Sequence, residues 1–118
     1  MQNKKQTGNE GELIAINFLV KNGYKILETN HTIKGGEIDI ICEKDEKIIF
    51  VEVKFRKNEN YGTGEEAFTK AKRKTLLRTI QKYCLSKKID LDNIQMDFVA
   101  ISKQKETYNL KHYENVEI

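Results

Sequence analysis

The segment around residues 37–54 constrains the fold most, because it places charged side chains inside two otherwise apolar stretches. Residues 38–42 and 48–55 are mainly apolar and are separated by a short polar run. Two such stretches around a polar turn predict an antiparallel β-hairpin. Because side chains alternate between the two faces of a strand, Glu52 and Lys54 share one face of the second strand, and the other face is wholly apolar.

The acidic side chains of this hairpin are predicted to meet. Strict alternation groups Glu37, Asp39 and Ile41 on one face of the first strand. A two-residue or a four-residue turn gives the same register, with Asp39 opposite Glu52 and Glu37 opposite Lys54. Two carboxylates about 5 Å apart repel by ~3 kcal/mol at an effective dielectric constant near 20, so we expect a compensating divalent cation beside Lys54. The alternative is a solvated strand end, with Asp39 capping its strand.

Composition predicts one globular domain over residues 1–118. Hydrophobic residues make up 38% of the chain and charged residues 33%, which suits a core with a polar surface. No apolar run exceeds four residues, so we expect neither a signal peptide nor a membrane span. The expected location is therefore the cytoplasm. Cys42 and Cys84 lack the spacing of a metal or redox motif and are expected to be reduced core thiols.

Positive charge is concentrated in one part of the chain. Residues 54–88 contain eleven basic and three acidic side chains, a net charge of +8, which leaves −5 for the rest. A capping box at residues 63–66 predicts a helix to about Ser86, with basic residues four apart along one face. Clustered basic side chains bind polyanions by releasing phosphate counterions. The predicted nucleic-acid contacts are Arg56, Lys70, Lys72, Arg73, Lys74 and Arg78.

A first helix is predicted from about residue 8 to residue 22. Thr7 to Glu10 fit a capping box, and Gly23 fits a helix stop. Glu12 lies on the apolar stripe that begins at Ala15, so its side chain should point along the buried side. Two interpretations of Glu12 stay open: an acid that complements the helix dipole, or a further ligand for a metal ion or water.

The rest of the chain predicts further strands. Residues 24–30 and 94–101 have strand patterns, residues 31–36 reverse the chain, and the tail at residues 107–118 predicts an edge strand. Asp97 is unusual within an apolar strand. We interpret it as the structural partner of a nearby lysine, with a catalytic role as the alternative.

The predicted order is helix, three strands, helix and strand, which gives an α/β fold of the mixed α+β type, with helices flanking a central mixed sheet. With an acid on the second strand and acid-x-Lys on the third, this αβββαβ core resembles the restriction-endonuclease-like PD-(D/E)XK superfamily. The motifs at residues 8–12, 36–39 and 51–56 look like those of the uncharacterised bacterial YraN-like family, itself similar to archaeal Holliday-junction resolvases. No proline precedes Asp39 in this chain.

The resemblance implies a metal-dependent active site. Asp39 and Glu52 would bind Mg²⁺ or Mn²⁺, Glu12 would help to complete the metal site, and Lys54 would position or deprotonate the attacking water. The expected reaction is hydrolysis of DNA phosphodiester bonds. The similarity to the resolvases further suggests branched DNA as the substrate and a homodimer as the assembly. Two alternatives stay open: a nucleic-acid-binding module without chemistry, and a protein-interaction domain whose basic helix is merely solvated.

Overall fold

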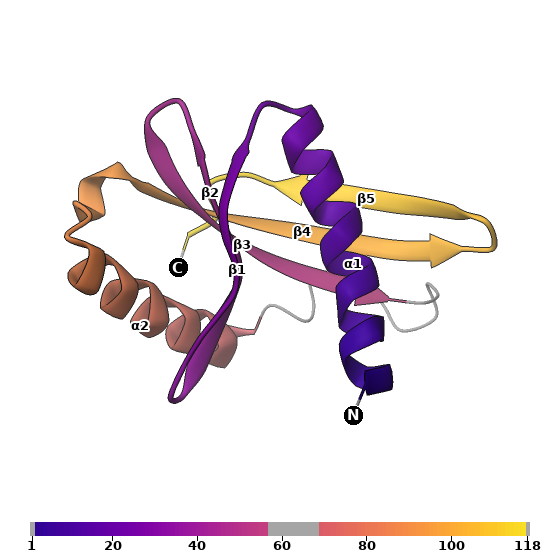
Figure 1. The fold of residues 1–118 in the computed structure, drawn as a ribbon, viewed down its shortest axis with the longest axis horizontal. Coiled ribbons are helices and arrows are strands. Elements are labelled where there is room, and N and C mark those ends of the chain that lie inside the picture. The colour runs from indigo at the N-terminus through magenta and orange to yellow at the C-terminus, as the bar shows by residue number, and fades with distance from the viewer. Residues whose placement is uncertain (1, 57–68, 118) are drawn as a thin grey trace.

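The computed structural model describes residues 2–56 and 69–117, with side chains from residue 10 onward in these ranges. The elements are α1 (Gln2–Lys21), β1 (Lys25–Ile33), β2 (Gly36–Lys44), β3 (Lys47–Arg56), α2 (Lys70–Lys87), the short 3₁₀ helix η3 (Leu91–Asn93), β4 (Ile94–Gln104) and β5 (Thr107–Tyr113). The five strands form one sheet in chain order, in which β3 and β4 are parallel and the other neighbours antiparallel (Figure 1). The predicted α+β architecture is confirmed.

Each face of the sheet is covered by one helix. α1 packs on the face that carries Ile40 and Val51, whereas α2 packs on the face that carries Phe50 (Figure 1). Leu19 of α1 and Ile80 of α2 are completely buried in these two layers. Because the inner strands are buried on both faces, they need nearly continuous apolar sequence. This pattern is the one from which the hairpin was predicted.

The strands confirm the predicted segments and extend them. β1 continues to Ile33, so the reversal predicted at residues 31–36 is confined to the turn around Gly35, whose φ is 93°. The turn between β2 and β3 is the two-residue type, because Asp45 and Glu46 have φ values of 52° and 67°. β5 is the edge strand that was predicted in the tail.

Side-chain alternation is regular in β3 and β4 but breaks in β2. Ile40 and Cys42 pack under α1, whereas Ile38 packs under α2. The predicted strict alternation of this strand is therefore wrong. The change of face occurs at Asp39, opposite Asn30 of β1, whose φ of 52° lies in the left-handed region. β2 thus places apolar side chains under both helices, and Asp39 lies where the face changes.

α1 is longer than predicted at its N-terminal end. It begins at Gln2 and runs through the expected capping box at Thr7, because the preceding glutamines and lysines favour helix. Its C-terminal end is as predicted: Gly23 has a φ of 90°, and the Tyr24 N–H donates to the Leu19 carbonyl at 3.0 Å. This left-handed glycine cap fixes where the chain turns into β1.

α2 begins at Lys70, after an N-cap at Thr69. The Thr69 hydroxyl accepts a hydrogen bond from the Lys72 N–H at 3.2 Å, which satisfies one of the free donors of the first turn. The capping box predicted at residues 63–66 lies outside the described residues. In the part of the chain that the structure describes, neither helix is long and apolar enough to cross a membrane.

Two glycines allow the helices to approach the sheet closely. A Cβ atom on Gly11 of α1 would lie 2.5 Å from the Cβ of Phe55 in β3. A Cβ atom on Gly36 of β2 would collide with the hydroxyl of Thr79 in α2. Any larger side chain at either position would push a helix away from the end of the sheet where the acidic residues lie.

Asp97 of β4 is completely buried and ties the C-terminal tail to the sheet. Its carboxylate lies 2.7 Å from His112 Nε2 and accepts hydrogen bonds from Gln95 Nε2 at 2.9 Å and from the Asn115 N–H at 3.0 Å. Burial opposes ionisation, but these hydrogen bonds and the charge of His112 outweigh it and lower the pKa of Asp97. The partner is therefore a histidine of β5 and not the predicted lysine.

We expect Asp97→Asn to lower the free energy of unfolding by about 2–4 kcal/mol at neutral pH, because it disrupts a buried hydrogen-bonded carboxylate. The folded pKa of Asp97 lies below its unfolded value of about 3.9, so its contribution is present above about pH 4 and is lost as the pH falls through the folded pKa. Urea unfolding followed by circular dichroism at neutral and acidic pH measures both effects. The matched control is Asp92→Asn, at an exposed position of η3, and equal stability of the two variants at neutral pH would contradict the prediction.

Candidate active site

The β2–β3 hairpin has the predicted register, but its ladder is short. Ile40 pairs with Val51, as predicted, and this is the last pair of the ladder. Asp39, Glu37 and Glu52 lie beyond it, so the predicted backbone pairing of the acidic residues is not formed. From this point the β1–β2 hairpin turns away from β3, and the sheet divides (Figure 1).

The side chain of Asp39 bridges the point of division. Its Oδ2 accepts a hydrogen bond from the Val53 N–H at 2.8 Å. This bond satisfies a backbone donor of β3 beyond the end of the ladder with β2. It also fixes the Asp39 carboxylate beside Glu52, the residue that precedes Val53.

Glu52 and Asp39 therefore meet through their side chains. Burial, the charge of Asp39 and a hydrogen bond with Asp39 raise the pKa of Glu52 to about 8, while the charge of Lys72 acts in the opposite direction. The raised pKa of Glu52 favours its protonated form when no cation is bound. The two acids lie close together, as predicted from the sequence, but through a contact between their side chains and not through backbone pairing of the two residues.

Lys54 lies beside this pair on the face of β3 that α2 covers. Burial and the positive charges of Lys72 and Arg56 lower the pKa of Lys54, and the charges of Glu52 and Asp39 oppose them. A lowered pKa increases the fraction of the amine that is unprotonated and therefore able to accept a proton. The site thus combines an acidic pair with a partly buried lysine whose proton affinity is reduced.

Glu12 of α1 approaches the same region from the other face. Its Oε1 accepts a hydrogen bond from Asn30 Nδ2 at 2.8 Å. Burial raises the pKa of Glu12, the hydrogen bond from Asn30 opposes this, and the charges of Asp39 and Glu37 raise the pKa further. The side chain therefore points toward the sheet, as predicted. Asn30 was not predicted, because nothing in the sequence links it to a helix residue.

The donor set suits a hard divalent cation only in part. Among the described residues, no group of three or more histidine, cysteine or acidic side chains is arranged to hold a metal ion. Asp39 and Glu52 form a pair, and Glu12 stays a predicted third ligand. Mg²⁺ commonly binds through one or two carboxylates and fills its other positions with water and phosphate oxygens, so the pair fits this ion or Mn²⁺.

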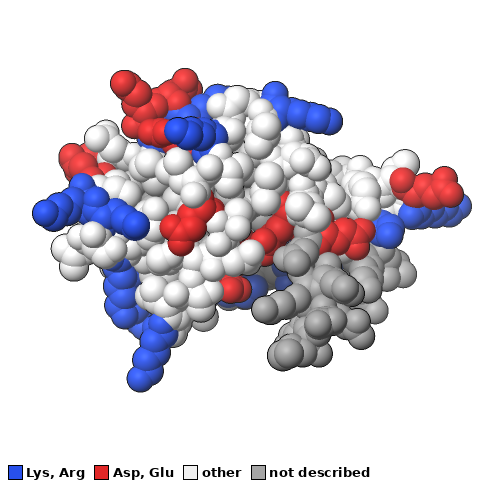
Figure 2. Space-filling view, viewed as in Figure 1, with Lys and Arg blue, Asp and Glu red and all other residues white. Residues whose placement is uncertain are grey.

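The basic residues of α2 are exposed, as predicted. They are Lys70, Lys72, Arg73, Lys74 and Arg78, and Arg56 of β3 is partly buried. Arg73 also lies near the chain end, with one guanidinium nitrogen 3.5 Å from the Glu117 carbonyl. Figure 2 shows acidic side chains across the middle of the face that α1 covers, and basic ones projecting on the lower left, where Figure 1 places α2 and the turn between β1 and β2.

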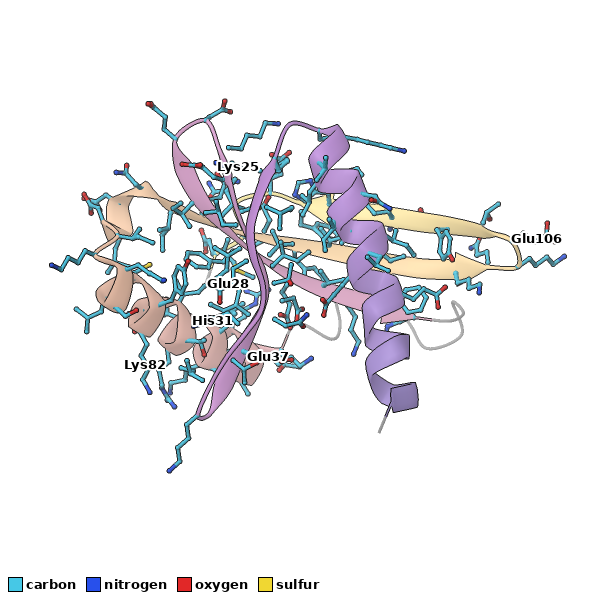
Figure 3. The ribbon with its side chains drawn as sticks, in the orientation of Figure 1. Lys25, Glu28, His31, Glu37, Lys82 and Glu106 are labelled. Carbon is cyan, nitrogen blue, oxygen red and sulfur yellow. The ribbon has the colours of Figure 1, made fainter. Side chains whose placement is uncertain are left out.

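Other reactive side chains lie outside this site. His31 of β1 points toward α2, with Nδ1 2.6 Å from Glu28 Oε2 and its ring edge-on to Tyr83 (Figure 3). Cys42 and Cys84 are buried free thiols, as predicted. Burial raises the pKa of both, that of Cys42 to about 12, so neither is a ready nucleophile.

Comparison with known proteins identifies relatives along most of the chain. The profile of "Uncharacterised protein family UPF0102" matches residues 11–101, which include the acidic pair and Lys54. A UPF0102 protein of Flavobacterium psychrophilum is 36% identical over 108 residues, covering 92% of this chain and 90% of the relative. Another, of Fusobacterium nucleatum, is 45% identical over 98 residues, covering 83% of this chain and 82% of the relative. The chain therefore belongs to the uncharacterised protein family UPF0102.

Proposed function

We propose that this protein is a metal-dependent nuclease that hydrolyses phosphodiester bonds in DNA. The observation that carries the proposal is the meeting of Asp39 and Glu52 where the sheet divides, with Lys54 beside them. Two carboxylates held close together repel each other, and a bound cation would offset this repulsion. The resemblance of the element order and of the acidic motif to the restriction-endonuclease-like superfamily supports the same reaction class.

A divalent cation, Mg²⁺ or Mn²⁺, would be held by Asp39 and Glu52, with Glu12 as a further predicted ligand. When bound, such an ion supplies a Lewis acid for the phosphoryl group and lowers the pKa of water. The residues of the chain have separate tasks. Asp39 is oriented by the Val53 N–H, Glu52 would have to be ionised to bind the cation, and Lys54 would position or deprotonate the attacking water.

In this hydrolysis a bond forms between the water oxygen and phosphorus, and the ester bond from phosphorus to one sugar oxygen breaks. The products are a phosphate monoester and a sugar hydroxyl, which takes up a proton from solvent. The exposed basic residues of α2 would bind the phosphates on either side of this bond. The resemblance to the resolvases extends the proposal to branched DNA and to a homodimer.

A second candidate is a nucleic-acid-binding module that keeps this scaffold without chemistry. It is favoured by the lack of a complete three-residue ligand set among the described residues and by the raised pKa of Glu52, which opposes ionisation of this ligand. The exposed basic side chains of α2 would then account for binding alone.

Cleavage of branched, flapped and duplex DNA in Mg²⁺ or Mn²⁺ distinguishes the two candidates. We expect Asp39→Asn and Lys54→Ala each to slow single-turnover cleavage by ~100-fold or more. DNA affinity should change little, because phosphate contacts elsewhere dominate it. The control is Glu106→Gln, at the exposed tip of the β4–β5 hairpin (Figure 3). A wild-type protein that binds DNA in a salt-dependent manner but cleaves none of the three would favour the binding module.

The raised pKa of Glu52 predicts a pH-dependent stability. Its folded value of about 8 lies above its unfolded value of about 4.3, so the folded state binds more protons between these limits. The metal-free protein should therefore lose stability as the pH rises from about 5 to about 8. Glu52→Gln should remove much of this loss, and Glu106→Gln should keep it.

Thermal unfolding in a chelator at several pH values measures this effect. Added Mn²⁺ should raise the Tm of the wild type more at pH ~8 than at pH ~6, because the cation and the proton compete for the same carboxyl pair. The Glu52→Gln variant should respond much less. Identical pH profiles for the wild type and Glu52→Gln would show that Glu52 titrates normally.

A further inference from the structure

Lys72 faces a different direction from the neighbouring basic residues of α2. The atoms closest to the Cβ position of Gly36 belong to Thr79 and Thr75 of this helix. Lys72 precedes Thr75 by three residues and Thr79 by seven, so all three lie on the side of the helix that faces β2. Lys74 lies two residues further on and therefore points to another side of the helix.

The position of Lys72 also brings its charge to the acidic pair. Its ammonium group acts electrostatically on both Glu52 and Lys54, which lie on the face of β3 that α2 covers. It lies in the first turn of α2. Lys72 thus belongs to the candidate site as well as to the basic surface.

Three cations gather beside the acidic pair. Lys54 and Arg56 come from β3 and Lys72 from α2, and the positive charges of Arg56 and Lys72 both act on Lys54. None of the ion pairs between described residues involves these three side chains. Within the same part of the chain, the buried Nε of Arg56 has no hydrogen-bond partner. Such a cluster suits an anion with several oxygen acceptors, of which phosphate is the best match.

We propose that Lys72, together with Lys54 and Arg56, binds the phosphate group of the substrate that undergoes hydrolysis. The inference rests on the proposed nuclease function and assigns Lys72 a catalytic role that the outward-facing Lys74 lacks. The phosphate would be held between α2 and β3, next to Asp39 and Glu52. There the lysine stabilises the negative charge on the phosphoryl oxygens as the ester bond breaks.

Inorganic phosphate and metal-free protein test the binding site without any reaction. In two-dimensional ¹H–¹⁵N NMR titrations, the wild type should show saturable shifts at Lys54, Arg56 and the first turn of α2. Lys72→Ala should weaken phosphate binding ~10-fold, Lys72→Arg should retain it, and Lys111→Ala, at an exposed position of β5, should change it by less than about twofold. Equal loss in the two alanine variants, or no saturable binding by the wild type, would overturn the proposal. Thermal unfolding of each variant confirms that it is folded.

Single-turnover cleavage at saturating DNA separates this inference from the nuclease proposal. Lys72→Ala should cleave ~100-fold more slowly, with partial recovery in Lys72→Arg, while Lys111→Ala should cleave at the wild-type rate. If the wild type cleaves and Lys72→Ala is equally fast, the role of Lys72 is refuted and the nuclease function stands. If the wild type cleaves no DNA but binds phosphate through Lys72, the nuclease function is refuted and the phosphate site stands.

Discussion

The hydrogen bond that Asp39 accepts from the Val53 N–H is the interaction on which the candidate site depends. It lies where the β2–β3 ladder ends, so it closes the paired part of the sheet and anchors a carboxylate at the opening. Beyond it, β2 no longer pairs with β3, and Glu52 and Lys54 lie on the part of β3 that is not paired with β2. One acidic side chain therefore terminates a strand pairing and supplies half of the acidic pair.

The two helical layers bring further residues to this opening. Gly11 lets α1 approach β3, and Gly36 lets α2 approach β2, at the end of the sheet where the strands separate. Glu12 thereby reaches the acidic pair from one face and Lys72 from the other. The sheet carries the acidic pair, and each helix brings the charge of one side chain close to it.

Sequence patterns predicted those features that depend on local periodicity. The alternation of the third strand placed Glu52 and Lys54 on one face, and the turn length set the register of the hairpin. The alternation rule failed at Asp39, because it assumes a strand paired without interruption. His112, the partner of the buried aspartate, was not predicted, because the tail was predicted only as an edge strand and without a register on β4. The orientation of Lys72 was not predicted either, because it depends on how α2 packs on β2.

Anomalous diffraction from crystals soaked in Mn²⁺ above about pH 8, where Glu52 can ionise, tests the central claim most directly. The account predicts one strong peak within about 2.5 Å of carboxylate oxygens from both Asp39 and Glu52. The peak should disappear in crystals of Asp39→Asn that retain the fold. A well-ordered opening without a peak, or a Mn²⁺ ion that contacts neither acid, would contradict the account.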